Sequence, residues 1–252
     1  MAAFTMDRMG TPPLGRPPRQ PLQRELARLG PVAQLRAGRL PRRLTQLAFG
    51  LVLYGLTLAM LIRATLGNAP WDVLHQGLAK HLPISIGTAV IAMSLVVLLA
   101  WIPLKEIPGL GTIANSFVIG LSADFFLARI HTPTSTGGQA VLMVAGILLN
   151  AVATALYIGS QFGPGPRDGL MTGLHRRTGV SIQVVRTSLE VSVVAVGWLL
   201  GGVVGIGTVA YALAIGPLVQ RLLPLAIVEL PERPTPAEPC LLPLDPGEPV
   251  AA

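Results

Sequence analysis

The chain has 252 residues, of which 51% are hydrophobic and 12% are charged, with a mean hydropathy of +0.61 and a formal net charge of +7. Soluble domains carry about 25% charged residues, roughly twice this share, so the composition excludes a soluble globular protein and predicts an integral membrane protein. The single cysteine, Cys240, excludes an internal disulfide framework.

The two ends of the chain carry most of its charge. Nine of the nineteen basic residues lie before Leu44, and five of the twelve acidic residues lie after Val228. Low hydrophobicity and many prolines predict a disordered basic arm over residues 1–43 and a disordered acidic tail over residues 229–252. Because basic residues near the first span mark the cytoplasmic side, we expect both termini in the cytoplasm.

Six apolar segments between these ends have the length that a helix needs to cross a bilayer, about 20 residues. Their expected bounds are Leu44–Ile62, Ile86–Leu104, Leu110–Ala128, Gln139–Tyr157, Ile182–Leu200 and Gly207–Leu223.

Two polar segments, GNAPWDVLHQGLAKHLPIS and GPGPRDGLMTGLHRRTGVS, follow the first and the fourth of these spans. Each is too short and too polar to span, begins with glycine and proline, and stops at Pro83 or Gly179, which predicts a short half-helix. The residues expected to set the two helix starts are Gly67, Pro70, Gly163 and Pro166.

These features belong to an internal repeat. Gly67–Gly120 aligns without a gap with Gly163–Gly216 at an offset of 96, and sixteen of the 54 positions are identical. Three spans per copy is an odd number, so the second copy must enter the membrane inverted. We therefore predict an all-α membrane protein of six spans in two inverted-topology repeats, residues 44–129 and 139–224, each with a half-helix.

Asp72 and Asp168 occupy equivalent positions in the first turns of the two half-helices. One interpretation is structural, because a carboxylate at a helix start interacts favourably with the helix dipole. The other is functional, because secondary transporters bind solutes where broken helices of inverted repeats meet near the bilayer midplane. The dipole ends favour an anion and the aspartates favour a cation or a proton, so the sequence leaves the sign of the solute open.

Other polar residues inside the spans are candidates as well. Arg186 and Glu190 are four residues apart and can pair on one helix face, either as a structural lock or as part of a gate. We expect Asp124 to reach interfacial water, Asn115 and Asn150 to hydrogen-bond between helices, and the tryptophans to anchor the chain at the interfaces. The candidate solute-binding residues are Asp72, Asp168, Arg167, Arg186 and Glu190.

Enzymatic signatures are lacking in the sequence. The four histidines show no HExxH spacing, there is no GxSxG element, and no Gly-Lys-Ser/Thr follows the glycine-rich turns. GLHRRTGVSIQVVR is similar to a DNA-binding helix-turn-helix, but the apolar LEVSVVAVGWLL after it needs lipid. We therefore expect no catalytic residue, no metal, no cofactor and no nucleic-acid partner.

The strings LVLYGLTLAM, APWDVLHQGLA, WIPL, PGLGT, GPGPRDGLMTGL and GTVAYALAIGPLVQ together resemble the YczE/YitT-like family of bacterial polytopic membrane proteins. The resemblance covers residues 42–223. It implies a multi-pass protein of the bacterial cytoplasmic (inner) membrane, and it transfers no site residues because that family has no settled activity.

Three functions remain open at this point. The first is a small-solute transporter or permease that works by alternating access, with an unknown small molecule or ion as solute. The second is a non-transporting accessory protein that regulates a membrane partner or a homo-oligomer through its charged ends. The third, an intramembrane enzyme, fits poorly, since the expected topology brings Asp72 and Asp168 in from opposite faces.

Overall fold

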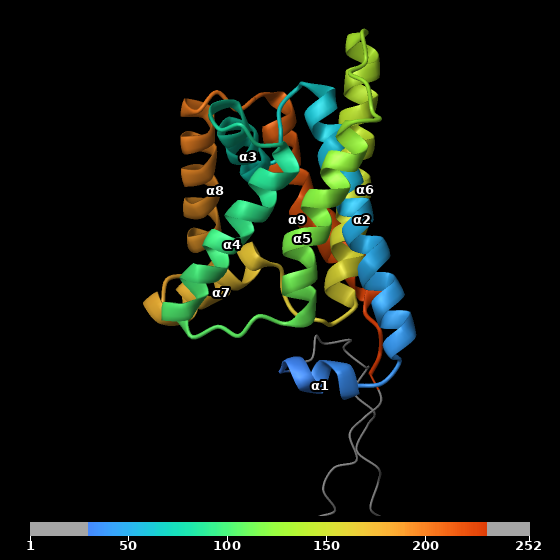
Figure 1. Ribbon diagram of the computed structural model, residues 1–252, viewed down its shortest axis with the longest axis vertical. Helices are drawn as coiled ribbons and strands as arrows, with labels where there is room; N and C mark the ends of the chain where they lie inside the picture. The colour runs from blue at the N-terminus through green and yellow to red at the C-terminus, as the bar shows by residue number, and fades with distance from the viewer. Residues whose placement is uncertain (1–29, 231–252) are drawn as a thin grey trace, which may run out of the picture.

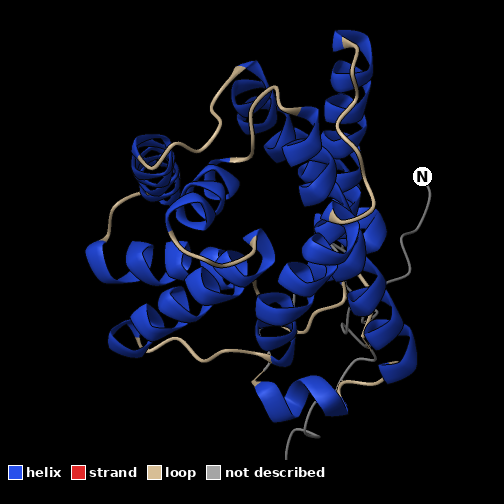
Figure 2. Cartoon of the chain, turned by 45° about the horizontal axis from the view of Figure 1, so that its top comes forward, coloured by secondary structure: helices blue, strands red, loops and turns tan. Residues whose placement is uncertain are grey.

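The computed structural model describes residues 30–230, and within this range it contains helices and loops but no β-strand (Figure 2). The all-helical class predicted from the sequence is confirmed for this part of the chain. The predictions for the basic arm before residue 30 and for the acidic tail after residue 230 lie outside the described residues.

Six of the described helices are long and apolar enough to cross a membrane, which confirms the six predicted spans. Their ends differ from the predicted ends by at most four residues, at the start of the first span, where Leu40 replaces Leu44. The six are α2 (Leu40–Ala64), α4 (Ile86–Leu104), α5 (Leu110–Leu127), α6 (Thr136–Gly159), α8 (Ile182–Leu199) and α9 (Ile206–Ala226).

The two polar segments form the short helices α3 (Pro70–His81) and α7 (Pro166–Thr178), as predicted. Each begins at its proline, whose missing N–H costs nothing in the first turn of a helix. Gly67 and Gly163 precede them with φ angles of +119° and +105°, a conformation that side chains disfavour. Figure 1 shows α3 at the upper end of the long helices and α7 at the lower end.

α2 lies between α5 and α6 and packs along both. α6 also packs on α9, α3 lies against α4 and α8, and α7 lies mainly against α4. The main core cluster is formed by apolar residues of α2, α4, α5 and α6, together with Phe162 in the loop after α6. α4 packs along α5, whereas α8 and α9 make at most marginal contact, and Figure 1 shows α8 at the left edge of the molecule.

The helical body begins earlier than the predicted boundary at residue 43. α1 (Pro31–Arg36) and the first residues of α2 fold against the lower end of the long helices. The reason is Arg43, which is fully buried and donates to the backbone carbonyls of Gln34, Ser160 and Gln161. A basic residue beside an apolar run is typical of a solvated flank, so its burial could not be expected from the pattern.

Candidate functional site

Two cavities lie between the helices. The first, which we call the α3 cavity, has a volume of about 50 Å³ and is lined by residues that include Asp72 and His75 of α3. The second, the α7 cavity, has a volume of about 190 Å³ and is lined by residues that include Asp168 and Met171 of α7. Trp71, Tyr157 and Arg167 line both cavities and therefore separate them.

All five residues predicted from the sequence as solute-binding candidates line these cavities. Asp72 lines the α3 cavity, and Asp168, Arg186 and Glu190 line the α7 cavity, while Arg167 lines both. Residues from α3, α7 and α8 that are up to 118 positions apart in the chain thus surround one polar centre.

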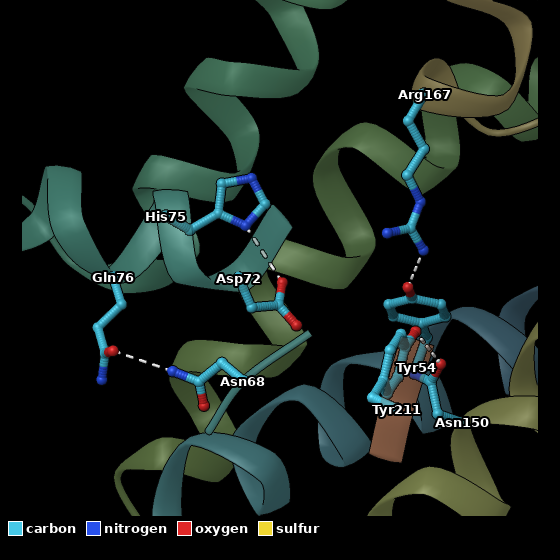
Figure 3. Close-up of polar contacts among 8 residues, drawn as sticks. All are labelled: Tyr54, Asn68, Asp72, His75, Gln76, Asn150, Arg167 and Tyr211. Carbon is cyan, nitrogen blue, oxygen red and sulfur yellow. Dashed lines mark hydrogen bonds and ion pairs between the residues drawn. The ribbon is translucent and has the colours of Figure 1, made fainter. Parts of the chain in front are cut away.

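Asp72 pairs with a histidine that the sequence analysis did not select. His75 lies one helical turn further along α3, and its Nδ1 lies 3.2 Å from Asp72 Oδ1, with both side chains buried (Figure 3). The signal was present in the sequence, since residues three apart on a helix share a face. It was passed over because Met171 is the equivalent of His75 in the second copy.

Asp168 takes a different partner. The hydroxyl of Tyr157, on α6, donates to Asp168 Oδ2 over 2.7 Å. The two equivalent aspartates therefore both accept a hydrogen bond, one from a histidine on its own helix and the other from a tyrosine on a long helix. No local pattern in the sequence could have selected Tyr157, because 11 residues and a loop separate it from Asp168.

Arg167 points from α7 towards Tyr54 of α2 and donates to its hydroxyl (Figure 3). Its Cζ lies 5.5 Å from the centre of the Tyr54 ring. Among residues 30–230, Arg167 forms no ion pair with a carboxylate. A guanidinium keeps its proton in proteins, so the Arg167 side chain stays charged.

A chain of neutral hydrogen bonds continues beyond Tyr54. The Tyr211 hydroxyl donates to Asn150 Oδ1 over 2.8 Å (Figure 3), and Asn150 Nδ2 donates to Thr57 Oγ1 over the same distance. These bonds connect α9, α6 and α2, which confirms the interhelical role predicted for Asn150. They satisfy buried polar groups that would otherwise destabilise the centre of the protein.

Arg186 and Glu190 of α8 form the predicted ion pair, with 2.9 Å between Nε and Oε1. Their side chains are 46% and 24% exposed, so the pair lies on the open side of the α7 cavity, where α8 stands apart from α9. Pairing reduces the cost of placing these two charges in a membrane-spanning helix.

Two of the three tryptophans do not lie where we expected them. Trp71 and Trp101 are 6% and 2% exposed and pack together inside the protein, so the prediction that they anchor the interfaces was wrong. Trp101 donates to the carbonyl of Pro166 over 2.9 Å. The indole N–H of Trp71 is buried and has no hydrogen-bond partner among the described residues.

Asp124 has a role that the sequence did not predict. Its carboxylate accepts from the backbone N–H of Gly87, over 2.8 Å, and from the hydroxyl of Ser85. Both partners lie at the start of α4, so Asp124 of α5 caps that helix and joins the two helices. An acceptor at a helix N-terminus satisfies donors that the helix itself cannot pair.

Known proteins resemble this chain over most of its length. It is 43% identical over 188 residues to an uncharacterized protein of Haemophilus influenzae, which covers 75% of this chain and 86% of the relative. It is 28% identical over 180 residues to the uncharacterized membrane protein YczE of Bacillus subtilis, over 71% of this chain and 84% of the relative. The expected resemblance to YczE is thereby confirmed, and no solved structure matches the chain.

A family described only as of unknown function, DUF6198, matches residues 41–224, which include both short helices and all six spans except the first residue of α2 and the last two of α9. With six apolar helices and a membrane protein among its relatives, the chain is a polytopic membrane protein. It belongs to the DUF6198 family.

Proposed function

We propose that this protein is a small-solute transporter, or permease, of the bacterial inner membrane. Two inverted-topology repeats, residues 44–129 and 139–224, open the α3 cavity and the α7 cavity in turn to opposite sides. Asp72, Asp168, Arg167, Arg186 and Glu190 contact the solute or the groups that hold it, and no covalent chemistry takes place.

The observation that carries the proposal is that the two cavities are built from equivalent residues. Nine residues that line the α3 cavity belong to the first aligned copy. For seven of these nine, the equivalent residue, 96 positions later, lines the α7 cavity. The seven pairs are Trp71/Arg167, Asp72/Asp168, His75/Met171, Val90/Arg186, Ser94/Glu190, Asn115/Tyr211 and Ile119/Ile215.

Equivalent backbone contacts between the two copies support the same symmetry. Gly111 N donates to Phe162 O, and Gly207 N donates to Leu66 O, both over 2.8 Å. The offset of 96 relates Gly111 to Gly207 and Leu66 to Phe162. The two hydrogen bonds therefore join equivalent positions, with the donor and the acceptor exchanged between the two copies. The positions of α3 and α7 at opposite ends of the long helices agree with an inverted second copy (Figure 1).

The two halves differ in how their long helices pack, which supports alternation between two states. α4 packs on α5 beside the smaller α3 cavity, whereas α8 and α9 stand apart beside the larger α7 cavity. On this proposal the α7 side is the open one in this conformation. The opposite conformation would close α8 on α9 and separate α4 from α5.

The distribution of charges supports one orientation in the membrane. Lys105, Arg176 and Arg177 lie near α7, at the end of the molecule where α2 begins. Since positive residues favour the cytoplasmic side, this end and both termini face the cytoplasm, and the α7 cavity opens inward.

Cysteine labelling tests the proposal. In a Cys240→Ser background, Ser94→Cys reports on the α3 cavity and Thr154→Cys on the α7 cavity. In oriented vesicles, a membrane-impermeant thiol reagent is expected to label Thr154→Cys only from the cytoplasmic side and Ser94→Cys only from the opposite side. Ser192→Cys, exposed on α8 outside both cavity linings, is the matched control and should resist a charged reagent from either side.

Two outcomes would contradict the proposal. Labelling of both cavity positions from the same side excludes inverted access. Labelling of Thr154→Cys alone, under all conditions of pH and added solute, indicates a static cavity and no alternation.

A further inference from the structure

The boundary between the two cavities has its own chemistry. Trp71 and Arg167 both line both cavities, and they are counterparts, since 71 and 167 differ by 96. Each is the second residue of its short helix, directly after the proline. On the proposed symmetry they therefore face each other across the two-fold axis, where a solute passes in either conformation.

We infer that this boundary binds the solute through an anionic group, a carboxylate or another oxyanion, held by the guanidinium of Arg167 and the indole N–H of Trp71. The inference rests on the proposed function and decides the sign of the solute, which the sequence left open.

Arg167 forms no ion pair within 4 Å among the described residues. A guanidinium has five N–H donors, and among the described residues the hydrogen bond of Arg167 goes to a neutral hydroxyl, that of Tyr54. The ion pairs of the described residues join Asp72 to His75, Glu106 to Arg176 and Glu190 to Arg186. A charged group inside a membrane protein is costly unless it is paired or hydrated, so an anionic ligand stabilises this arginine.

The nearby carboxylates are less available to a cation. Asp168 already accepts from the Tyr157 hydroxyl, and Asp72 is paired with His75 on the same helix. Arg186 and Glu190 neutralise each other. Arg167, in the shared wall of the cavities, has no ion pair among the described residues.

Trp71 supplies an independent observation. An indole N–H can donate but cannot accept, and that of Trp71 is buried without a partner among residues 30–230. A buried donor that is left unpaired costs free energy, and an oxygen of a bound anion would satisfy it. The N-terminal turns of α3 and α7, where both residues lie, add the positive ends of two helix dipoles.

Fluorescence quenching of Trp71 tests the inference on the full chain in lipid nanodiscs. Trp71 emission is taken as the difference between the wild type and Trp71→Phe. Iodide, an anionic quencher, is expected to quench this emission more strongly than caesium, a cationic one. Acetate and inorganic phosphate should protect against iodide, and tetramethylammonium should not.

Arg167→Gln keeps a polar side chain and removes the charge. We expect it to weaken the protection by acetate about tenfold or more, as the loss of a charge-assisted hydrogen bond predicts. Quenching by neutral acrylamide should stay unchanged, which shows that the cavity is intact. Arg176→Gln is the matched control, because Arg176 pairs with Glu106 on the surface and lines neither cavity.

Stronger quenching by caesium than by iodide would overturn the inference, as would full acetate protection in Arg167→Gln. Quenching of Trp71 by neither ion, in protein that acrylamide reaches, would also overturn it. The assay involves no flux, so its result is independent of the labelling test. If iodide quenching indicates an anion site but both cysteines are labelled from the same side, the protein binds an anion without transporting it. If the two cysteines are labelled from opposite sides but caesium quenches more strongly than iodide, the protein transports a cation.

Discussion

Arg43 shows how one buried charge can organise an end of the molecule. Its guanidinium is fully buried, lies 4.2 Å from the centre of the Phe162 ring and donates to three backbone carbonyls. Two of these carbonyls, of Ser160 and Gln161, follow α6, and the third belongs to Gln34 of α1. The last carbonyls of a helix have no partner within it, so one side chain satisfies groups that water cannot reach.

We expect Arg43→Ala to lower the free energy of unfolding by about 3 kcal/mol or more, because it removes hydrogen bonds from a charged donor and leaves buried carbonyls unpaired. Arg43→Lys should recover only part of the loss, since an ammonium cannot reproduce the planar fork of donors. Denaturant unfolding in mixed micelles, followed by circular dichroism, measures both. Arg42→Ala, the exposed neighbour, is the control and should change stability little. Equal effects at positions 42 and 43 would contradict the role given to Arg43.

The polar centre could be predicted from the sequence only in part. Asp72 and Asp168 were found because proline and aspartate recur at the same offset, and that signal is independent of packing. Trp71 carried no such signal, because a tryptophan near a span end is more often an interfacial anchor. Tyr54 and Tyr157 come from other helices, and their approach to α7 depends on how those helices cross.

Two equivalent contacts, of α3 with α8 and of α7 with α4, each depend on a glycine, but the glycine lies on the long helix in the first and on the short helix in the second. Where α3 meets α8, a Cβ on Gly197 would lie 2.5 Å from the backbone of Leu74. Where α7 meets α4, a Cβ on Gly169 would lie 2.0 Å from the ring of Trp101. Gly197 is the counterpart of Trp101, so the large and small residues are exchanged between the helices. At each of the two contacts, one glycine allows the two helices to approach closely.

We expect Gly169→Ala to destabilise the fold by about 1–3 kcal/mol, because the added methyl group overlaps the Trp101 ring and forces α7 away from α4. In a Trp101→Leu background the same substitution should cost less than about 1 kcal/mol, and this coupling identifies the contact. Unfolding free energies of the wild type, both single variants and the double variant form the cycle. Gly137→Ala on α6, where nothing lies within 4 Å, is the control. Additive effects at 101 and 169 would contradict the proposed contact.

The elements themselves were largely predictable. The six spans follow from length and hydropathy, since about 20 apolar residues leave few alternatives. α3 and α7 follow from the glycine and proline at their starts. α1 and the first turn of α2 were missed, because their order depends on the burial of Arg43 against distant carbonyls, a contact that no local pattern indicates.

At the scale of the whole molecule, the difference between the two halves has an identifiable cause. A Cβ on Gly87 would lie 2.1 Å from the carbonyl of Gly120, so α4 and α5 touch there, and Asp124 caps α4 beside this contact. The counterparts of Gly87 and Asp124 are Gln183 and Gln220. α8 therefore has a side chain where α4 has none, and α9 has a neutral amide where α5 has a carboxylate.

Introducing the residues of the α4–α5 contact at the equivalent positions of α8 and α9 should bring these two helices together. We expect Gln183→Gly with Gln220→Asp to bring α8 onto α9, because the bulk is removed and the new carboxylate can cap α8 at Ser181, the counterpart of Ser85. Labelling of Thr154→Cys in the α7 cavity should then fall about tenfold, as an added bias of about 1.4 kcal/mol predicts. The α3 cavity should become accessible at the same time, so that Ser94→Cys is labelled from the opposite side.

The controls separate closure from local damage. Gln183→Gly alone removes the bulk without adding the cap and should change labelling less than the pair of substitutions. The converse pair, Gly87→Gln with Asp124→Gln, should open α4 from α5 and increase labelling of Ser94→Cys. If both pairs of substitutions change the two cavities in the same direction, the cavities are not alternatives of one equilibrium, because alternating access requires one to close as the other opens.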